Sequence, residues 1–273
     1  MQVPKGFSKR VLSNRAVVHH RDFPQILDSS TAGLEQLNSR YGSWVSRTYV
    51  GDGIVIREKK DRPNIIIKSK IIGDIHLDTG SVETWFHNAL KAREAIKGER
   101  AVEFERPLGY SDSGNGTYYS LHYAGSPLSS AQYEIKLDEE HLISFVRGLA
   151  MLHSDDIYHH HLFADNIMVV AQQDDPTFVI IDPKFIYVGE HNERKPKTGS
   201  EPRTIQEIPR KEKIQHDIFP FVVACHRILE GTPPQKSSKF IRFLTRVEKT
   251  YQKVNRVSGD LLDERFFNAL FNP

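Results

Sequence analysis

The hydrophobic pattern of the chain changes near residue 123, and this change constrains the fold. Residues 43–71 and 105–125 are rich in β-branched and aromatic residues and are interrupted by turns that contain glycine or proline, as strands are. Between them, residues 81–98 space their apolar side chains as a helix does. After residue 123, most apolar residues recur at helical spacing. This order predicts an α+β fold, with a β-rich first part around one main helix and a mainly helical second part.

The same patterns predict the individual elements. We expect strands at 43–50, 54–60, 64–72, 105–110, 117–125 and 177–183. We expect helices at 81–98, 141–154, 216–231 and 237–254, and a short one at 32–38. The chain then divides into an N-terminal extension (1–40), a β-rich lobe (41–123) and a helical lobe (124–273).

The composition is that of an ordinary globular protein. Of the 273 residues, 38% are apolar and 26% are charged, and the formal net charge is +2. This balance gives no indication of nucleic-acid binding, and no apolar run approaches the roughly 20 residues that a membrane span requires. The single cysteine, Cys225, fits a reducing compartment, and the basic start lacks the apolar core of a signal peptide. We expect a cytoplasmic protein, although a secreted effector without a cleavable signal would have the same composition.

One polar loop is typical of phosphoryl-transfer chemistry. Residues 157–170, IYHHHLFADNIMVV, follow an apolar helix and contain three histidines and Asn166. The short buried strand expected at 177–183 contains Asp182. A carboxylate and an amide carbonyl are oxygen ligands that suit Mg²⁺. A cation held in this way neutralises the charge that builds up on phosphate oxygens during transfer.

The loop resembles the catalytic loop of the protein-kinase-like superfamily, in the form of small bacterial-type kinases such as the lipopolysaccharide kinases. In this resemblance His159, His160 and His161 take the places of the usual His-Arg-Asp. Asn166 takes the place of the metal-binding asparagine, and Asp182 takes that of the aspartate of Asp-Phe-Gly.

Further matches occur in the same order as in that superfamily. Lys68 resembles the strand lysine that binds the α- and β-phosphates. Glu83, on the helix that follows, resembles its glutamate partner, and Glu94 is the alternative. Gly51 and Gly53 occupy the place of the glycine-rich loop.

The resemblance also implies where a nucleotide binds. The strand that contains His122 corresponds to the hinge against which adenine stacks, and Asp217 corresponds to the aspartate that holds the loop backbone from beneath. ATP and Mg²⁺ would lie between two lobes, bound by Lys68, Asn166 and Asp182. We therefore expect a two-lobed, protein-kinase-like fold with a shortened helical lobe and with ATP and Mg²⁺ as cofactors.

The main departure from the superfamily pattern is His161, at the position of the catalytic aspartate. An imidazole accepts a proton near neutral pH but does not supply the negative charge of a carboxylate. Three explanations stay open: His161 is the base of an unusual phosphotransferase, the protein binds nucleotide without turning it over, or Asp165 takes the role. We expect that transfer is retained, because Lys68, Asn166 and Asp182 are all present.

The expected function is transfer of the ATP γ-phosphate to a hydroxyl of a protein, sugar or lipid acceptor. The alternative is a pseudokinase, a binding or scaffolding module without catalysis. A metal-dependent hydrolase is a third option, since His159 and His161 could face one ion if the segment is extended. The literal His20-Arg21-Asp22 is a chance match, because no β-rich lobe precedes it and no asparagine follows at the required spacing.

The polar segment 189–213 contains seven lysines and arginines and five acidic residues. It is either a solvated loop or, over 194–213, a contact for an anionic acceptor or a protein partner.

Overall fold

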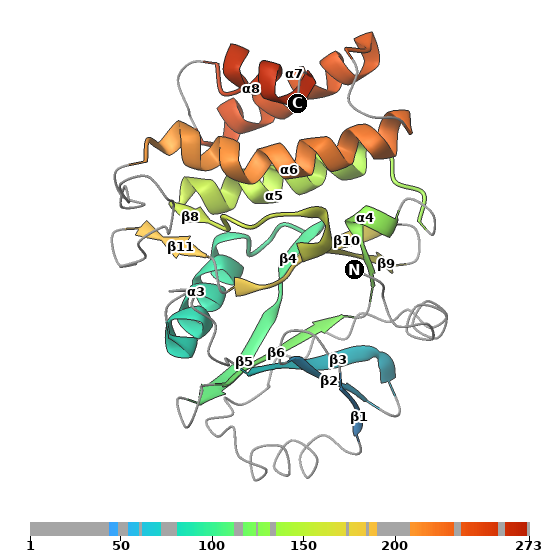
Figure 1. Ribbon diagram of the computed structural model, residues 1–273, viewed down its shortest axis with the longest axis vertical. Coiled ribbons are helices and arrows are strands. Elements are labelled where there is room, and N and C mark those ends of the chain that lie inside the picture. The colour runs from blue at the N-terminus through green and yellow to red at the C-terminus, as the bar shows by residue number, and fades with distance from the viewer. Residues whose placement is uncertain are drawn as a thin grey trace.

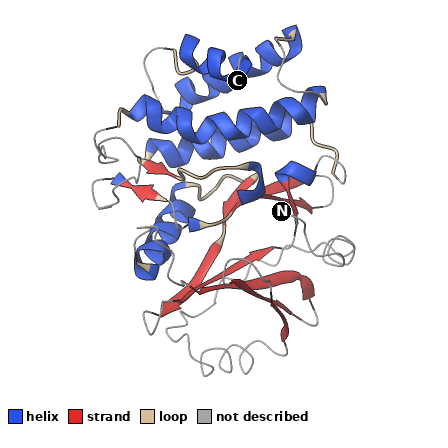
Figure 2. Ribbon diagram, in the orientation of Figure 1, coloured by secondary structure: helices blue, strands red, loops and turns tan. Residues whose placement is uncertain are grey.

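The computed structural model describes residues 44–48, 54–59, 62–71, 81–111, 117–123, 125–131, 135–172, 175–183, 186–189, 208–231, 236–255 and 260–271. Within 44–71 and for residues 121–123, it describes only the course of the backbone. The N-terminal extension, with its expected helix at 32–38, lies outside the described residues. The described chain combines strands and helices (Figure 2), and this mixture confirms the α+β class at the coarse level.

A five-stranded antiparallel sheet forms one end of the molecule (Figure 1). Its spatial order is β1-β2-β3-β6-β5, and its strands are β1 (Trp44–Thr48), β2 (Ile54–Lys59), β3 (Arg62–Ile71), β5 (Arg106–Ser111) and β6 (Thr117–Tyr123). β-Branched runs such as Ile65–Ile67 favour this extended backbone. The expected first hairpin and third strand are confirmed. In the register of β3 and β6, Lys68 pairs with Ser120.

Helix α3 (Val82–Ala95) packs on this sheet and on the rest of the molecule. Its N-cap is Ser81, whose side chain accepts a hydrogen bond from the Thr84 amide at 3.1 Å. Trp85 and Phe86 form a small apolar cluster with Tyr118 of β6. The following turns of the helix belong to the main core instead. Helix α3 therefore joins the two parts of the fold.

A second, four-stranded sheet lies between the first sheet and the large helices (Figure 1). Its order is β4-β10-β9-β7, and its strands are β4 (Val102–Phe104), β7 (Ser126–Pro127), β9 (Ile167–Gln172) and β10 (Asp175–Ile180). β9 and β10 are antiparallel, and Ile167 pairs with Ile180. The residues just before β9 and just after β10 are therefore neighbours, which positions the site described below.

The helical part contains α4 (Leu128–Ala131), α5 (Glu139–Ser154), α6 (Arg210–Glu230), α7 (Ser238–Asn255) and α8 (Glu264–Phe271). The prediction for the third large helix was wrong at its start, because α6 begins at Arg210 and not at residue 216. Ile214 is fully buried in this added turn, so tertiary packing extends the helix into the polar segment. Among the described helices, none is both long and apolar enough to cross a membrane.

Helix α5 is the centre of the main core. Phe145 contacts Phe178 of β10 and Phe221 of α6, with ring centroids 5.2 Å and 4.5 Å apart. A Cβ added to Gly148 would lie 2.7 Å from the Val102 side chain, so only glycine permits this close approach of α5 to β4. The second sheet is thus packed directly against the helices that support the loop.

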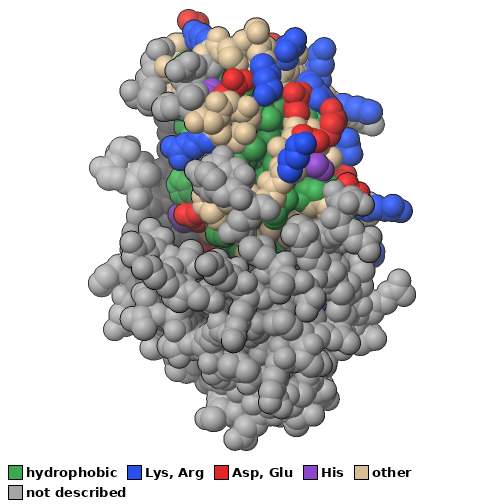
Figure 3. All heavy atoms as spheres, turned by 90° about the vertical axis from the view of Figure 1, so that its right-hand side faces the viewer, with side chains coloured by type: hydrophobic (Ala, Val, Ile, Leu, Met, Phe, Trp, Pro, Cys, Tyr) green, Lys and Arg blue, Asp and Glu red, His purple; other side chains and the backbone are tan. Residues whose placement is uncertain are grey.

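The described basic residues of the polar segment are engaged within the chain. Lys211 lies 2.8 Å from Asp263, and the Arg210 guanidinium donates to the His153 carbonyl oxygen at 2.9 Å. Basic and acidic side chains are interspersed over the helical part in the view of Figure 3. An anionic partner at 194–207 stays a prediction, because those positions lie outside the described residues.

Candidate functional site

The loop that follows α5 contains most of the expected site residues. It passes through the short strand β8 (Ile157–Tyr158), which pairs with β11 (Tyr187–Val188), and ends in the 3₁₀ turn η1 (Ala164–Asn166) before β9. His160 has a φ of +57°, in the left-handed region that non-glycine residues rarely adopt. The surrounding contacts must therefore hold this backbone in place.

A buried carboxylate of α6 holds the loop from below. Asp217 Oδ2 accepts a hydrogen bond from the His159 amide, and Oδ1 accepts one from the His160 amide, both at 2.6 Å. Hydrogen bonds to an ionised carboxylate are about twice as strong as neutral ones. Two of them at consecutive amides offset the strain at His160. The prediction that Asp217 holds the backbone of this loop is confirmed.

The same carboxylate belongs to a buried network between α5, α6 and α7. His153 Nε2 lies 3.1 Å from Asp217 Oδ2, and His153 Nδ1 lies 3.0 Å from the Tyr251 hydroxyl. Burial alone would raise the pKa of Asp217, but the hydrogen bond from His153, together with the electrostatic effect of His153 and His160, outweighs burial and holds this pKa well below its ordinary value. Burial and then the charge of Asp217 raise the pKa of Tyr251. Asp217 is therefore an ionised carboxylate, and Tyr251 keeps its phenol proton.

His159 connects the loop to the strand that leads to Asp182. Its Nε2 lies 2.9 Å from the Ile181 carbonyl oxygen, and its Nδ1 lies 3.3 Å from the His161 amide. A carbonyl only accepts and an amide only donates, so His159 is neutral with its proton on Nε2. Because both ring nitrogens have backbone partners, the structure does not support a metal ion shared by His159 and His161.

The expected metal-binding asparagine contacts the residue at the base position. Asn166 Nδ2 lies 2.8 Å from the His161 carbonyl oxygen and 2.9 Å from His161 Nδ1. The amide nitrogen is thus directed at His161, and the amide oxygen Oδ1 is directed elsewhere. Both side chains are half-buried.

Asp182 is brought close to Asn166 by strand pairing. The Ile181 amide donates to the Asn166 carbonyl oxygen at 3.0 Å, directly before Asp182. Asp182 is 7% exposed and has a φ of +76°. The segment after it is fixed by Asn88 of α3, whose Nδ2 donates to the Ile186 carbonyl oxygen at 3.0 Å. The structure therefore brings the backbone of Asn166, which is in contact with His161, and the backbone before Asp182 together at one end of the β9–β10 pair.

The expected residues of the first sheet are less completely described. Lys68 lies in β3 and His122 lies in β6, and the structure describes the backbone of both. Gly51 and Gly53 lie outside the described residues. Their roles stay predictions.

Neither expected glutamate of α3 lies in the interior. Glu83 accepts a hydrogen bond from the Tyr110 hydroxyl at 2.9 Å and lies 3.8 Å from His87, and its side chain is 51% exposed. Glu94 pairs with Lys97 at 3.0 Å, and its side chain is 72% exposed. The described contacts of both glutamates are thus surface contacts on α3 and β5, and a pairing with Lys68 stays a prediction.

The interior acid on this side is Glu105, which the sequence reading missed. Glu105 is 1% exposed, and its Oε2 accepts a hydrogen bond from the Ser120 hydroxyl at 3.2 Å. Ser120 is the register partner of Lys68. Burial, followed by the charge of Glu105, raises the pKa of Tyr118. No sequence signal marked Glu105, because a single acid between β4 and β5 is more often exposed.

Asp165, the other possible base, is exposed and is hydrogen-bonded to the Ser129 hydroxyl of α4. This contact holds its carboxylate on the α4 side of the loop. The structure does not support a transfer of the base role to Asp165.

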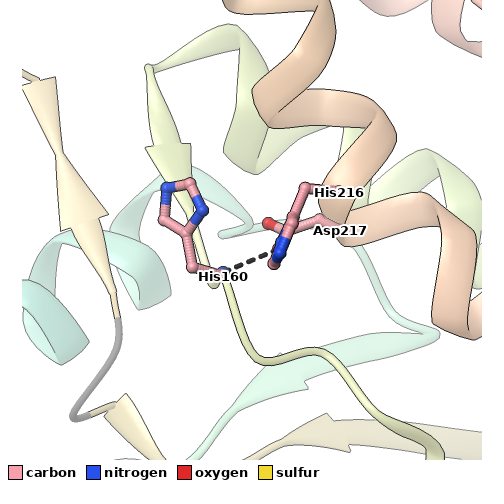
Figure 4. A group of neighbouring side chains, drawn as sticks. All are labelled: His160, His216 and Asp217. Atoms are coloured by element: carbon pink, nitrogen blue, oxygen red, sulfur yellow. Dashed lines mark hydrogen bonds between the residues drawn. The ribbon is translucent and has the colours of Figure 1, made fainter. Parts of the chain in front are cut away.

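His160, His216 and Asp217 form a group of possible metal ligands, with one ligand atom of each within 4.8 Å of the others (Figure 4). The rings of His160 and His216 are 5.6 Å apart between centroids. Both Asp217 oxygens already accept hydrogen bonds from the loop backbone. These contacts account for the position of Asp217, and only proximity suggests a metal.

No protein-family model matches the sequence, and none of the curated proteins matches it at a significant level. The function is therefore inferred from the site alone.

Proposed function

We propose that the chain is an atypical kinase-like phosphotransferase with two lobes, the β-rich lobe 41–123 and the helical lobe 124–273. ATP and Mg²⁺ bind between the lobes, and the γ-phosphate passes to a hydroxyl of a protein, sugar or lipid. One observation carries the proposal: Asp217 holds the loop from beneath, while the Asn166 carbonyl oxygen accepts a hydrogen bond from Ile181, the residue directly before Asp182, where β9 and β10 are paired.

The donor set fits a hard divalent cation. Mg²⁺ is bound in proteins by a few oxygen ligands and keeps several waters. Asn166 Nδ2 is directed at His161, so Oδ1 is the atom of this side chain that would bind the cation. The Asp182 carboxylate would supply the second ligand. A cation held by these two residues would neutralise charge on the phosphate oxygens, which the protein positions.

Lys68 and Glu105 form the corresponding charged pair of the β-rich lobe in this proposal. The Ser120 hydroxyl, at the register position of Lys68, donates to Glu105. The residue of α3 that contacts this segment is basic, since Arg93 donates to the carbonyl oxygen of Phe104, next to Glu105, at 2.5 Å. We therefore expect the acid that orients the strand lysine to come from the segment between β4 and β5, and not from α3.

The second candidate is a pseudokinase that binds the nucleotide without turning it over. It is favoured by the absence of a carboxylate at position 161 and by the contact that holds Asp165 at Ser129. Both candidates share the nucleotide site and differ only in phosphoryl transfer.

Thermal unfolding with MgATP, together with transfer of γ-labelled phosphate to proteins, sugars and lipids of a lysate, tests both candidates. A ligand at 100 times its Kd stabilises the folded protein by about 2.7 kcal/mol. We expect this stabilisation and label transfer in the wild type, and loss of both in Asp182→Asn. The matched control is Asp175→Asn, at the exposed start of the same strand β10, which should behave as the wild type.

The outcomes separate the candidates. Stabilisation without transfer of label would favour the pseudokinase. Neither stabilisation nor transfer in the folded wild type would refute both.

A further inference from the structure

The orientation of the Asn166 side chain is determined by its neighbours. The nitrogen end of its amide lies 2.8 Å from the His161 carbonyl oxygen. An amide oxygen at this place would face another acceptor, so the NH₂ group must occupy it. The backbone carbonyl alone therefore decides which end of the Asn166 amide is the NH₂ group, whatever the protonation state of the imidazole.

The second hydrogen of this NH₂ group determines the state of the imidazole. His161 Nδ1 lies 2.9 Å from Asn166 Nδ2. A proton on Nδ1 would place two donors against each other, so Nδ1 accepts the hydrogen bond with its lone pair. The proton of the neutral ring is then on Nε2.

The loop backbone keeps the ring in this position. The His161 amide is 3.3 Å from His159 Nδ1, and the His159 amide is bound to the buried Asp217. The backbone of Asn166 is also anchored. Its backbone N–H donates to the Phe163 carbonyl oxygen at 2.8 Å, and its backbone carbonyl oxygen accepts from the Ile181 amide at 3.0 Å. Both partners of the Asn166–His161 contact are thus held by backbone hydrogen bonds.

We propose that Asn166 locks His161 as the neutral tautomer with its proton on Nε2, and that His161 donates a hydrogen bond to an anionic phosphate oxygen instead of acting as a base. The phosphate role rests on the proposed function, whereas the tautomer does not. A base needs a lone pair on the nitrogen that faces the acceptor hydroxyl, and here that nitrogen carries the proton. Neutral imidazoles do act as donors to developing oxyanions in enzymes.

This role is compatible with phosphoryl transfer. As the bond from phosphorus to the β-phosphate bridging oxygen breaks, the bond to the acceptor oxygen forms. The acceptor proton passes to an oxygen of the transferred phosphoryl group, and no protein group takes it. Because the transition state of phosphoryl transfer is loose, the protein contributes mainly by positioning the reactants and stabilising charge.

The tautomer is measured by nitrogen-15 NMR of histidine-labelled protein without nucleotide, and His161→Gln assigns the signal. We expect a protonated Nε2 and an unprotonated Nδ1. In Asn166→Asp, at mildly alkaline pH, we expect the proton on Nδ1, because a carboxylate only accepts. A wild-type ring protonated at Nδ1 would overturn the inference even if MgATP binds.

The phosphate role is measured as MgATP affinity in two folded variants of similar size. Glutamine at position 161 keeps an N–H donor, whereas leucine has none. We expect His161→Gln to stay close to the wild type and His161→Leu to bind roughly tenfold more weakly, as for loss of one hydrogen bond to a charged group. Equal affinities of the two variants would overturn the phosphate role.

Failure of the inference is thus distinguishable from failure of the proposed function. If the proton is on Nε2 but the wild type does not bind MgATP, the proposed function and the phosphate role are both refuted, and the tautomer is upheld. If MgATP binds and the proton is on Nδ1, only the inference is refuted.

Discussion

Asp217 accepts hydrogen bonds from two consecutive backbone amides and from one imidazole, and all of these contacts are buried or partly buried. Its partners come from the loop and from α5, and the network continues through His153 to Tyr251 of α7. A single carboxylate therefore determines the course of the loop backbone on which Asn166 and His161 depend.

At this scale we predict the effect of Asp217→Asn. The new amide group would set an NH₂ against a backbone N–H and would remove the negative charge that accepts these buried hydrogen bonds. We expect a loss of about 3 kcal/mol in the free energy of unfolding, because a buried donor loses its charged acceptor, measured by urea unfolding near neutral pH. The control is Asp260→Asn, an exposed residue, for which we expect about 0.5 kcal/mol or less.

The same variant tests the ionisation of Asp217. Its pKa is lowered in the folded state, so its stabilising contribution is complete above its ordinary value of 3.8 and declines as the pH falls below that value toward the lower pKa of the folded state. One proton contributes at most about 1.4 kcal/mol per pH unit to this decline. As the pH falls below 3.8, the free energy of unfolding should decrease more steeply in the wild type than in Asp217→Asn. Parallel plots of this free energy against pH would contradict the lowered pKa of Asp217.

At the scale of elements, helix α3 differs from the expectation derived from the kinase resemblance. Its inward-facing polar residue is Asn88, which binds the segment after Asp182, and its two glutamates lie at the surface. The interior acid, Glu105, follows β4 and is bound by Ser120 of β6. The segment between β4 and β5 therefore contains an interior acid, whereas the kinase resemblance led us to expect one on α3.

We predict that Glu105→Gln weakens MgATP binding about tenfold, as for loss of a charge that orients a phosphate-binding lysine. Glutamine still accepts from Ser120, so the packing is kept while the charge is removed. The controls are Glu83→Gln and Glu94→Gln, which should bind MgATP as the wild type does. Affinities are measured by isothermal titration. A loss in Glu83→Gln with none in Glu105→Gln would restore the original assignment.

At the scale of the whole molecule, the apolar clusters that the described residues form differ in size. The large one includes α5, α6, α7 and the second sheet, whereas the five-stranded sheet meets α3 through a small cluster around Trp85, Phe86 and Tyr118. Stability from burial scales with the apolar area removed from water. The contact between α3 and the five-stranded sheet should therefore open more easily than the helical end.

Fluorescence can test this difference, because the two tryptophans, Trp44 in β1 and Trp85 in α3, are both at the sheet end. We expect their fluorescence to change at a lower urea concentration than the far-ultraviolet circular dichroism, which is dominated by the helices. Saturating MgATP should bring the two transitions together, since a ligand between the lobes stabilises both. Coincident transitions without ligand would contradict the prediction.

The sequence predicted the secondary-structure elements and the site residues to different extents. The periodicity located α3, α5, α7, the five-stranded sheet and β10, because local patterns of apolar residues decide which backbone can bury them. It missed β4 and β7, which are too short to show a pattern, and it also missed β9 and α8. It began α6 too late, because Ile214 is buried only by the tertiary fold. In the site, the order of motifs identified Asp217, whose contacts agree with its expected role.

The sequence by itself determined the positions of α3, α5, α7 and the five-stranded sheet and the identity of the loop residues, since both depend on residues that are close along the chain. Only the tertiary structure decided that Glu105 is the interior acid and that Asn166 directs its NH₂ at His161. The reason is physical: burial and hydrogen bonding of a polar group depend on which distant segments surround it, and no local pattern records them.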